Sequence, residues 1–504
     1  MTPFARAGRR LDIPEPPHYG WLGPGGGRSR FVRAPLEFRG STIQVCGLWP
    51  FATGTATPMV GVPLGRSLIN DATVCCDPLS WFQEANLIHN PSCFILGKPG
   101  LGKSSVIRRM SLGLAGYGVL SMFLGDTKGE HVDLVQAMGG RVFRLGPNRD
   151  YINVLDISQA FETERRLHAA GFPDQADEVR ADAERRRLIL VETLISIARK
   201  GVPVTDRETA IIGEALTLLA RQSDIPPVLP DLIRLIEARP EELSRVALDR
   251  GDEGRYQDIT ENLVVSLRAM TGHGQVGEIF SRQSTVKLDL DRSCVFDISA
   301  VRSDDALLAA SLVVCWSVGF GAVSIGQVLY ECGLEPLRHW FIPLDELWRP
   351  IRAGQGMVDR VDELTRLNRQ WGVAQVPCTH TMSDLVSLPN PADAEKARGF
   401  VERAGMVICG GLPKREMRLL TEVVDLSEQE VNTLTGWQDP PNWDQDGTDA
   451  PPPGRGNFLI KVGGRPGIPI HVALTPAELS LNDTNKLWHE RSRLQLDDIE
   501  EGVA

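Results

Sequence analysis

The stretch Gly97–Ser104, with the sequence GKPGLGKS, constrains the fold of this chain more than any other stretch. It fits the pattern G-x-x-x-x-G-K-S/T of a phosphate-binding loop (P-loop). The apolar run 93–96 predicts a short buried strand that enters the loop, and residues 106–112 predict a helix that leaves it. Glycines let successive backbone N–H groups point at phosphate oxygens, and the helix N-terminus adds its positive dipole end. The sequence therefore predicts a nucleotide-binding loop; the alternative is a glycine-rich turn that binds nothing.

The residue types in this loop predict separate tasks. We expect the Lys103 ammonium to contact the β- and γ-phosphates of ATP, and the Ser104 hydroxyl to bind Mg²⁺. The predicted nucleotide-binding residues are Gly97, Lys98, Pro99, Gly100, Leu101, Gly102, Lys103, Ser104 and Ser105.

A second motif supplies the other half of a predicted hydrolytic site. The largely apolar run 340–344 leads directly into Asp345 and Glu346, which is the pattern of a Walker B strand. We expect Asp345 to hold Mg²⁺, typically through water, and Glu346 to polarise the water that attacks the γ-phosphate. Positions 103 and 345 lie 242 residues apart, so the two motifs require an inserted domain between them.

Polar residues that follow two other predicted strands are further candidates. Asp126 and Glu130 follow the apolar strand 118–124, and such residues lie beside the ligand crevice of a doubly wound sheet. An equally good interpretation is a capped turn that opens the next helix. His380 follows the strand 372–378 and is a candidate sensor of the γ-phosphate or of the attacking water; a histidine satisfied within its own turn is the alternative.

Two arginines upstream of that strand are candidates for a role between subunits. Arg366 and Arg369 lie on a predicted helix, and one of them could be an arginine finger that reaches the nucleotide of a neighbouring subunit. Ordinary surface arginines are the simpler interpretation.

Changes of composition along the chain predict its domains. Residues 158–289 are charged with apolar residues at helical spacing, which predicts a mainly helical insertion. Its Arg/Glu-rich part is most simply a solvated helix face, with a nucleic-acid or partner surface as the alternative. The predicted organisation is a flexible N-terminal arm at 1–40, a small β-containing region at 41–92 with strand-like runs at 42–46 and 59–63, a RecA-like, additional-strand P-loop ATPase core at 93–157 and 290–480, the helical insertion at 158–289 and a charged tail at 481–504.

Composition bounds the class of protein. The fold class is predicted to be α/β, with no N-terminal signal peptide. A net charge of −11 argues against a general nucleic-acid binder, although it leaves room for a local basic pore in an oligomer. Nine cysteines without C-x-x-C spacing predict free thiols in a reducing cytoplasm, with neither zinc nor disulfides. The uncharged stretch 306–330 is long enough to span a membrane, but a span there would separate the P-loop from Asp345. We therefore expect a buried helix and no integral membrane span.

The order of the motifs resembles a known family. After the P-loop come DTKGEH, NVLD, a helical insertion, VFDIS, PLDELW, a strand ending in TH, and GNFLIKVGG. Over roughly residues 60–480 this order resembles the ATPases of conjugative type IV secretion systems, of the VirB/TraC type in the HerA–FtsK branch of P-loop ATPases. The family commonly has Thr-Gln at Thr379-His380, and it usually has a larger N-terminal domain. This chain therefore resembles the motor portion.

The resemblance implies an ATP-hydrolysing, Mg²⁺-dependent motor that powers channel assembly or the transfer of DNA or protein. It also implies a homo-oligomer, often a hexamer, that acts with other secretion or conjugation components in the cytoplasm or at the inner face of the cell membrane. Two alternatives are a DNA-pumping translocase or coupling protein of the same branch, which would bind DNA directly, and a nucleotide-binding assembly scaffold with little turnover.

Overall fold

The computed structural model describes most of the chain between residues 58 and 481. The predicted arm at 1–40, the run 42–46, the tail beyond residue 481, and both Arg366 and Arg369 lie outside the described residues. The described ranges are 58–223, 225–271, 279–285, 287–352, residue 358, 372–388, 390–439, residue 452 and 454–481.

One sheet organises the described chain. It has eleven strands in the order β2-β1-β11-β10-β9-β3-β8-β7-β4-β6-β5. The strands from β9 to β5 are parallel, and β10, β11, β1 and β2 extend the sheet with antiparallel pairs. The strands are β1 Pro63–Ser67, β2 Thr73–Cys75, β3 Cys93–Leu96, β4 Leu120–Asp126, β5 Arg141–Arg144, β6 Cys294–Asp297, β7 Trp340–Leu344, β8 Val373–Thr379, β9 Met406–Cys409, β10 Asn457–Lys461 and β11 Ile468–His471.

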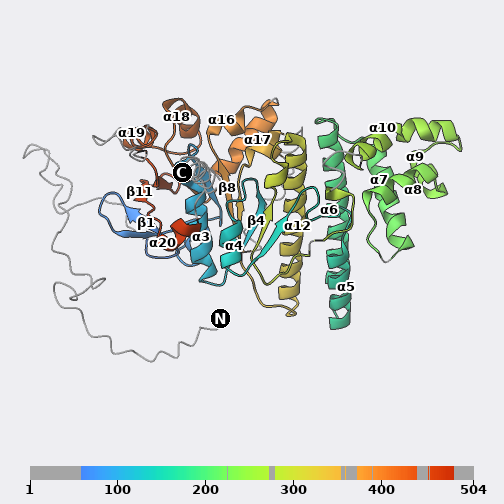
Figure 1. Cartoon of the computed structure of the whole chain (residues 1–504), viewed down its shortest axis with the longest axis horizontal. Helices are drawn as coiled ribbons and strands as arrows, with labels where there is room; N and C mark the ends of the chain where they lie inside the picture. The colour runs from blue at the N-terminus through green and yellow to red at the C-terminus, as the bar shows by residue number, and fades with distance from the viewer. Residues whose placement is uncertain are drawn as a thin grey trace, which may run out of the picture. The chain divides into compact units, whose positions relative to one another are not determined.

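Helices cover both faces of the parallel part of the sheet. This is why β3 and β7 are apolar along their whole length and fully buried. Figure 1 shows α3 and α4 on one side of the strands and α12 on the other. The helices of the core are α2 Pro78–Gln83, α3 Lys103–Ala115, α4 Val132–Ala137, α12 Asp305–Glu331, α13 Trp348–Arg352, α16 Met382–Val386, α17 Pro391–Glu402, α18 Lys414–Thr421, α19 Glu428–Gly436 and α20 Pro476–Leu481.

The side chains of β3 alternate between two hydrophobic cores. Phe94 and Leu96 pack into the core that contains α12, whereas Cys93 and Ile95 pack into the core that contains α3. This alternation follows from the two-residue period of a strand. The P-loop strand is therefore anchored on both faces of the sheet.

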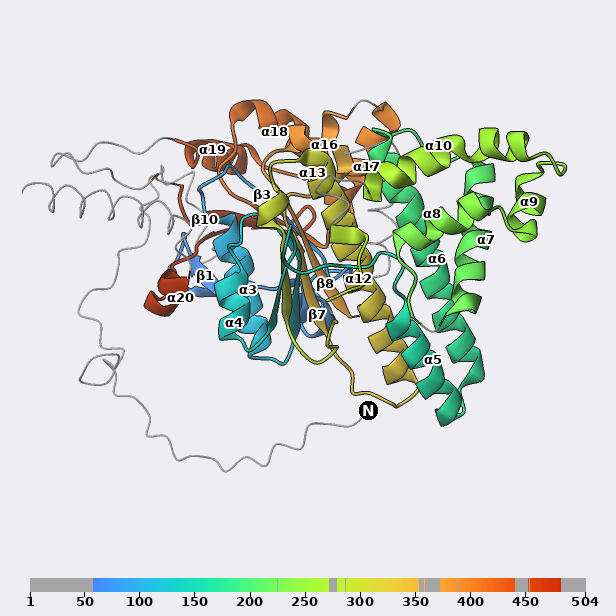
Figure 2. The same cartoon turned by 45° about the vertical axis from the view of Figure 1, so that its right-hand side comes forward.

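Between β5 and β6 the described chain is helical. Figure 2 shows these helices grouped on the α12 side of the sheet, with α6 nearest to α12. Sequence signals fix some of their ends: Pro173 occupies the first turn of α6, and Thr205 and Glu208 form a reciprocal capping box on α7. The helices are α5 Ser158–Ala170, α6 Pro173–Ala198, α7 Asp206–Gln222, α8 Leu229–Ala238, α9 Glu241–Ala247 and α10 Glu253–Thr271.

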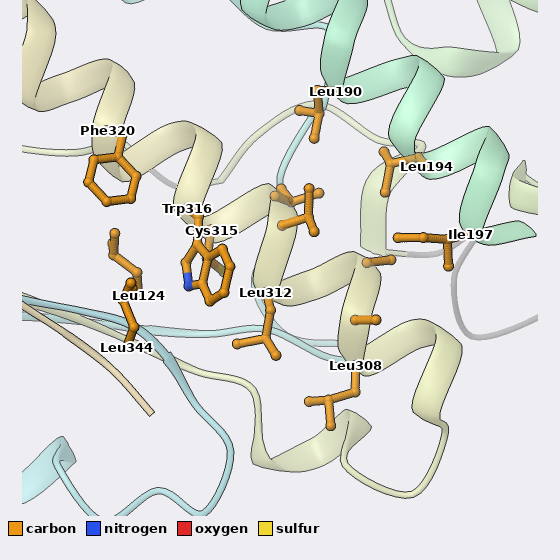
Figure 3. Close-up of a cluster of buried hydrophobic side chains, with 14 of the residues drawn as sticks. Leu124, Leu190, Leu194, Ile197, Leu308, Leu312, Cys315, Trp316, Phe320 and Leu344 are labelled. Atoms are coloured by element: carbon orange, nitrogen blue, oxygen red, sulfur yellow. The ribbon is translucent and has the colours of Figure 1, made fainter. Parts of the chain in front are cut away.

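The long apolar helix α12 joins these helices to the sheet. Figure 3 shows Leu312 and Trp316 of α12 beside Leu124 of β4, with Leu190 and Leu194 of α6 in the same cluster. Among the described residues, α12 is long and apolar enough to cross a membrane, and 78% of its most apolar window is buried inside the protein. This burial agrees with the prediction of a buried helix. Apolar side chains of β4 pack against one side of α12, and those of α6 pack against the other.

One predicted strand is wrong. Residues 59–62 form no strand, and β1 begins only at Pro63. Gly61 has φ +103°, and the Asp77 carboxylate accepts the N–H of Val62 at 2.9 Å, so this segment turns instead of extending. The strand β1 then pairs with β11, which makes it part of the main sheet.

The burial of α12 predicts a large difference between two leucines that both lie on helices. Leu312 is 1% exposed in the core, whereas Leu112 of α3 is 40% exposed. We expect Leu312→Ala to lower the free energy of unfolding by about 2–5 kcal/mol, because it removes buried methyl groups and leaves a cavity. Leu112→Ala should cost under about 1 kcal/mol. Denaturant unfolding measures both, and equal losses would contradict the described packing.

Candidate functional site

The P-loop connects β3 to α3 and is fixed on its outer side by two other segments. Gly100 and Gly102 have φ +81° and +101°, a region that favours glycine. The N–H of Lys98 donates to the Gly411 carbonyl at 3.1 Å, and the N–H of Gly456 donates to the Leu101 carbonyl at 3.0 Å. The segments after β9 and before β10 therefore hold the loop in its curve.

Close packing also limits which residues the loop accepts. A Cβ on Gly97 would lie 3.2 Å from the Cα of Gly410. Pro99 is exposed at the turn of the loop, and Ser104 and Ser105 lie half-buried in the first turn of α3. All nine predicted nucleotide-binding residues thus lie in one strand–loop–helix unit at the carboxyl end of β3.

Lys103 is buried beneath the loop, and only 7% of the residue is exposed. Its Nζ donates to the Gly97 carbonyl at 2.6 Å and to the Lys98 carbonyl at 3.2 Å. Burial lowers the pKa of Lys103. Its Nζ also lies 2.9 Å from Nδ1 of His380. The P-loop lysine is therefore in direct contact with the end of β8, the strand beside β3.

His380 connects the P-loop to the acidic motif. Its Nε2 lies 3.6 Å from Oε1 of Glu346, on the side opposite Lys103. A Lys103 ammonium can only donate to an unprotonated Nδ1, which assigns the proton of a neutral imidazole to Nε2, facing Glu346. The chain direction after His380 is fixed by Thr381, which caps α16 through a reciprocal bond with Asp384.

Glu346 is 4% exposed and surrounded by donors. Its Oε2 accepts a hydrogen bond from Nε1 of Trp348 at 2.7 Å, and its Oε1 lies 3.4 Å from Nζ of Lys128. Burial raises the pKa of Glu346, but the hydrogen bonds from His380 and Trp348 and the positive charge of Lys128 outweigh it and lower the pKa to about 2. The backbone of Glu346 has φ +53°, which is uncommon for this residue type and characteristic of functional sites.

The surroundings of Asp345 disfavour its negative charge. Burial and the neighbouring Glu346 carboxylate raise the pKa of Asp345. Its Oδ1 accepts the backbone N–H of Glu346 at 3.0 Å. The two adjacent carboxylates after β7 and the Ser104 hydroxyl in the first turn of α3 are oxygen donors of the kind that suits Mg²⁺. A bound cation would also offset the repulsion between Asp345 and Glu346.

The candidates Asp126 and Glu130 shape a loop rather than present their carboxylates to Lys103. Asp126 accepts three backbone N–H groups, from Lys128 at 3.2 Å, Glu130 at 3.1 Å and His131 at 2.7 Å. The Glu130 carbonyl accepts a hydrogen bond from the guanidinium of Arg108 on α3. The hydrogen bonds of Asp126 lie within the loop, and the helix α4 that follows it has no side-chain cap.

Sequence reasoning missed Lys128 and Trp348, which both contact Glu346. Lys128 lies in sequence between the candidates Asp126 and Glu130. Its position just after a strand was the only sequence signal that could have marked it as a site residue. His131 was also missed; it is 3% exposed and stacks on Phe123 with ring centroids 4.3 Å apart. Burial lowers its pKa to about 4, so it is neutral at pH 7.

Comparisons with known proteins agree with this architecture. No protein-family model and no curated protein matches the chain. Among solved structures the chain is similar to VirB4 of Thermoanaerobacter pseudethanolicus, at 17% identity and a TM-score of 0.59, over 84% of this chain and 99% of VirB4. The fold resembles that of VirB4. Two structures of the bacterial conjugative coupling protein TrwB also match at 12% identity, with TM-scores of 0.48 and 0.49, over 76% and 83% of this chain and 86% and 90% of TrwB.

The likeness to VirB4 confirms the predicted fold class, an α/β P-loop domain with a large mixed sheet and many helices. It also confirms, as a likeness of fold, the resemblance that the order of the motifs predicted. The roles of the individual site residues remain predictions.

The opposite pKa shifts of Asp345 and Glu346 predict opposite effects on stability. The raised pKa of Asp345 means that its charge costs folding free energy at pH 7. The lowered pKa of Glu346 means that its charge contributes stability, which is present above pH 4.5 and lost as the pH falls toward 2.

We therefore expect Asp345→Asn to raise the thermal midpoint at pH 7, and Glu346→Gln to lower it, each by about 2–4 °C. Calorimetry in EDTA without nucleotide measures both shifts. Shifts of the same sign would contradict the described electrostatics.

Proposed function

We propose that this chain is an ATP-hydrolysing motor of a conjugation or type IV secretion apparatus. The observation that carries the proposal is the contact series Lys103–His380–Glu346, which joins a P-loop lysine to the carboxylate of an acidic strand end. The likeness of fold to VirB4 supports the choice of apparatus.

In the proposed reaction, the N–H groups of residues 98–103 and the Lys103 ammonium bind the phosphates of ATP. Ser104 and Asp345 would hold Mg²⁺, which neutralises phosphate charge. A water oxygen bonds to the γ-phosphorus as the bond to the bridging oxygen of ADP breaks, and the proton of the water leaves toward Glu346 or a phosphate oxygen. Because a carboxylate with a pKa near 2 is a weak base, the main task of Glu346 is to orient and polarise the water.

The remaining parts of the proposal concern assembly. We infer a homo-oligomer, such as a hexamer, that acts with other secretion or conjugation components at the inner face of the cell membrane. Arg366 or Arg369 would serve as the arginine finger between subunits. The net charge of −11 disfavours a general DNA-binding translocase. The donors gathered around Glu346 favour a hydrolytic site over a scaffold with little turnover.

Two substitutions test the proposed roles. We expect Lys103→Ala to weaken ATP binding at least about 100-fold, because it removes a buried cation from the phosphate site. Glu346→Gln should keep or strengthen ATP binding and lower kcat at least about 100-fold, because an amide polarises the water poorly. Isothermal titration and phosphate release measure the two quantities.

The matched controls come from an exposed ion pair outside the site, Lys287 with Glu162. Lys287→Ala and Glu162→Gln should leave both binding and turnover within about twofold of wild type, as expected for exposed pairs. Turnover of Glu346→Gln at the wild-type rate would exclude the role assigned to Glu346. A wild-type chain that binds no ATP would exclude the function itself.

A further inference from the structure

Lys128 is a second cation at the site, beside the P-loop lysine. It lies at the tip of the loop between β4 and α4, and its side chain is 45% exposed. Burial lowers its pKa, but the charges of Asp345 and Glu346 outweigh this and raise the pKa of Lys128 overall. Lys128 is therefore an ammonium at neutral pH, with its Nζ 3.4 Å from Oε1 of Glu346.

The loop that carries Lys128 is fixed relative to the P-loop helix. The Asp126 carboxylate holds the loop from inside through the three backbone N–H groups described above. From outside, Arg108 of α3 is 6% exposed and donates to the Glu130 carbonyl. The backbone of Lys128 is thus held with respect to Lys103, five residues before Arg108, while the four-carbon side chain of Lys128 stays free to redirect its ammonium.

Lys128 and Lys103 converge on the same carboxylate–histidine pair. Oε1 of Glu346 lies 3.4 Å from Lys128 Nζ and 3.6 Å from His380 Nε2, and the other ring nitrogen of His380 contacts Lys103. Burial, and to a smaller extent the positive charge of Lys128, lower the pKa of Lys103. A multiply charged phosphate that reaches Lys103 would therefore compete with the single charge of Glu346 for Lys128.

We propose that Lys128 senses the terminal phosphate of a bound nucleoside triphosphate, with Glu346 and the γ-phosphate as its two alternative partners. With the γ-phosphate present, the ammonium moves from Oε1 of Glu346 to a γ-phosphate oxygen. This move frees Oε1 to accept a hydrogen bond from the attacking water and adds a cation where charge develops in the transition state. With a nucleoside diphosphate, Lys128 stays on Glu346. The inference rests on the proposed ATPase function.

The test compares two nucleotides on one variant. Lys128→Met keeps the length and the apolar stem of the side chain but removes its charge. We expect it to weaken binding of a non-hydrolysable ATP analogue about 10- to 100-fold, the usual worth of a charge-assisted hydrogen bond. Binding of ADP should stay within about twofold of wild type. Titration with each nucleotide and Mg²⁺ gives both affinities, and unchanged ADP binding shows that the variant is folded.

Two further variants sharpen the result. Lys128→Arg keeps a positive charge and should retain most of the preference for the triphosphate. Lys287→Met removes an exposed lysine outside the site and should change neither affinity.

Equal changes in analogue and ADP affinity for Lys128→Met, or no change in either, would overturn the role of Lys128 and leave the proposed function standing. A wild-type chain that binds neither nucleotide would overturn the proposed function and this inference together.

Discussion

The charge network around Glu346 is the interaction on which the candidate site depends. Burial of the Glu346 carboxylate removes its charge from water at a cost in free energy. Donors from three separate parts of the chain offset this cost. Lys128 follows β4, His380 follows β8 and Trp348 begins α13, directly after the acidic motif. Because β4, β7, β8 and β3 are consecutive parallel neighbours, their carboxyl ends meet at one edge of the sheet. The order of the strands thus determines which charges meet.

The same network gives the adjacent carboxylates of Asp345 and Glu346 opposite pKa shifts, which suit different roles. Glu346 is stabilised as an anion, and its lowered pKa suits a group that orients water. Asp345 is destabilised as an anion, and its raised pKa suits a group that gains from a cation. A site that stores such repulsion is less stable than an inert one, which is the usual cost of a functional site. Its rigidity comes from elsewhere: from β3 packed on both faces and from α12 packed between the sheet and α6.

The sequence was informative where a signal is local and less so where it depends on long-range pairing. The P-loop could be predicted from its local motif. The strands before Asp345 and His380 could be predicted because each is a largely apolar run followed by polar residues. That His380 lies between Lys103 and Glu346 could not, because it depends on β8 pairing between β3 and β7. Lys128 was missed because the backbone of its loop is held by Asp126 and Arg108, which are distant from Glu346 in sequence. The strand predicted at 59–63 failed because Gly61 and Asp77 form a turn there.

The proposed reaction depends on His380, which couples the P-loop lysine to the carboxylate that orients water. The most direct measurement is steady-state ATP hydrolysis at saturating ATP and Mg²⁺ by His380→Ala and His380→Gln. We expect the alanine variant to lose at least about 100-fold in kcat, because the link between Lys103 and Glu346 is gone. The glutamine variant, whose amide can still contact both groups, should stay within about tenfold of wild type. Wild-type turnover by His380→Ala would show that His380 does not couple Lys103 to Glu346.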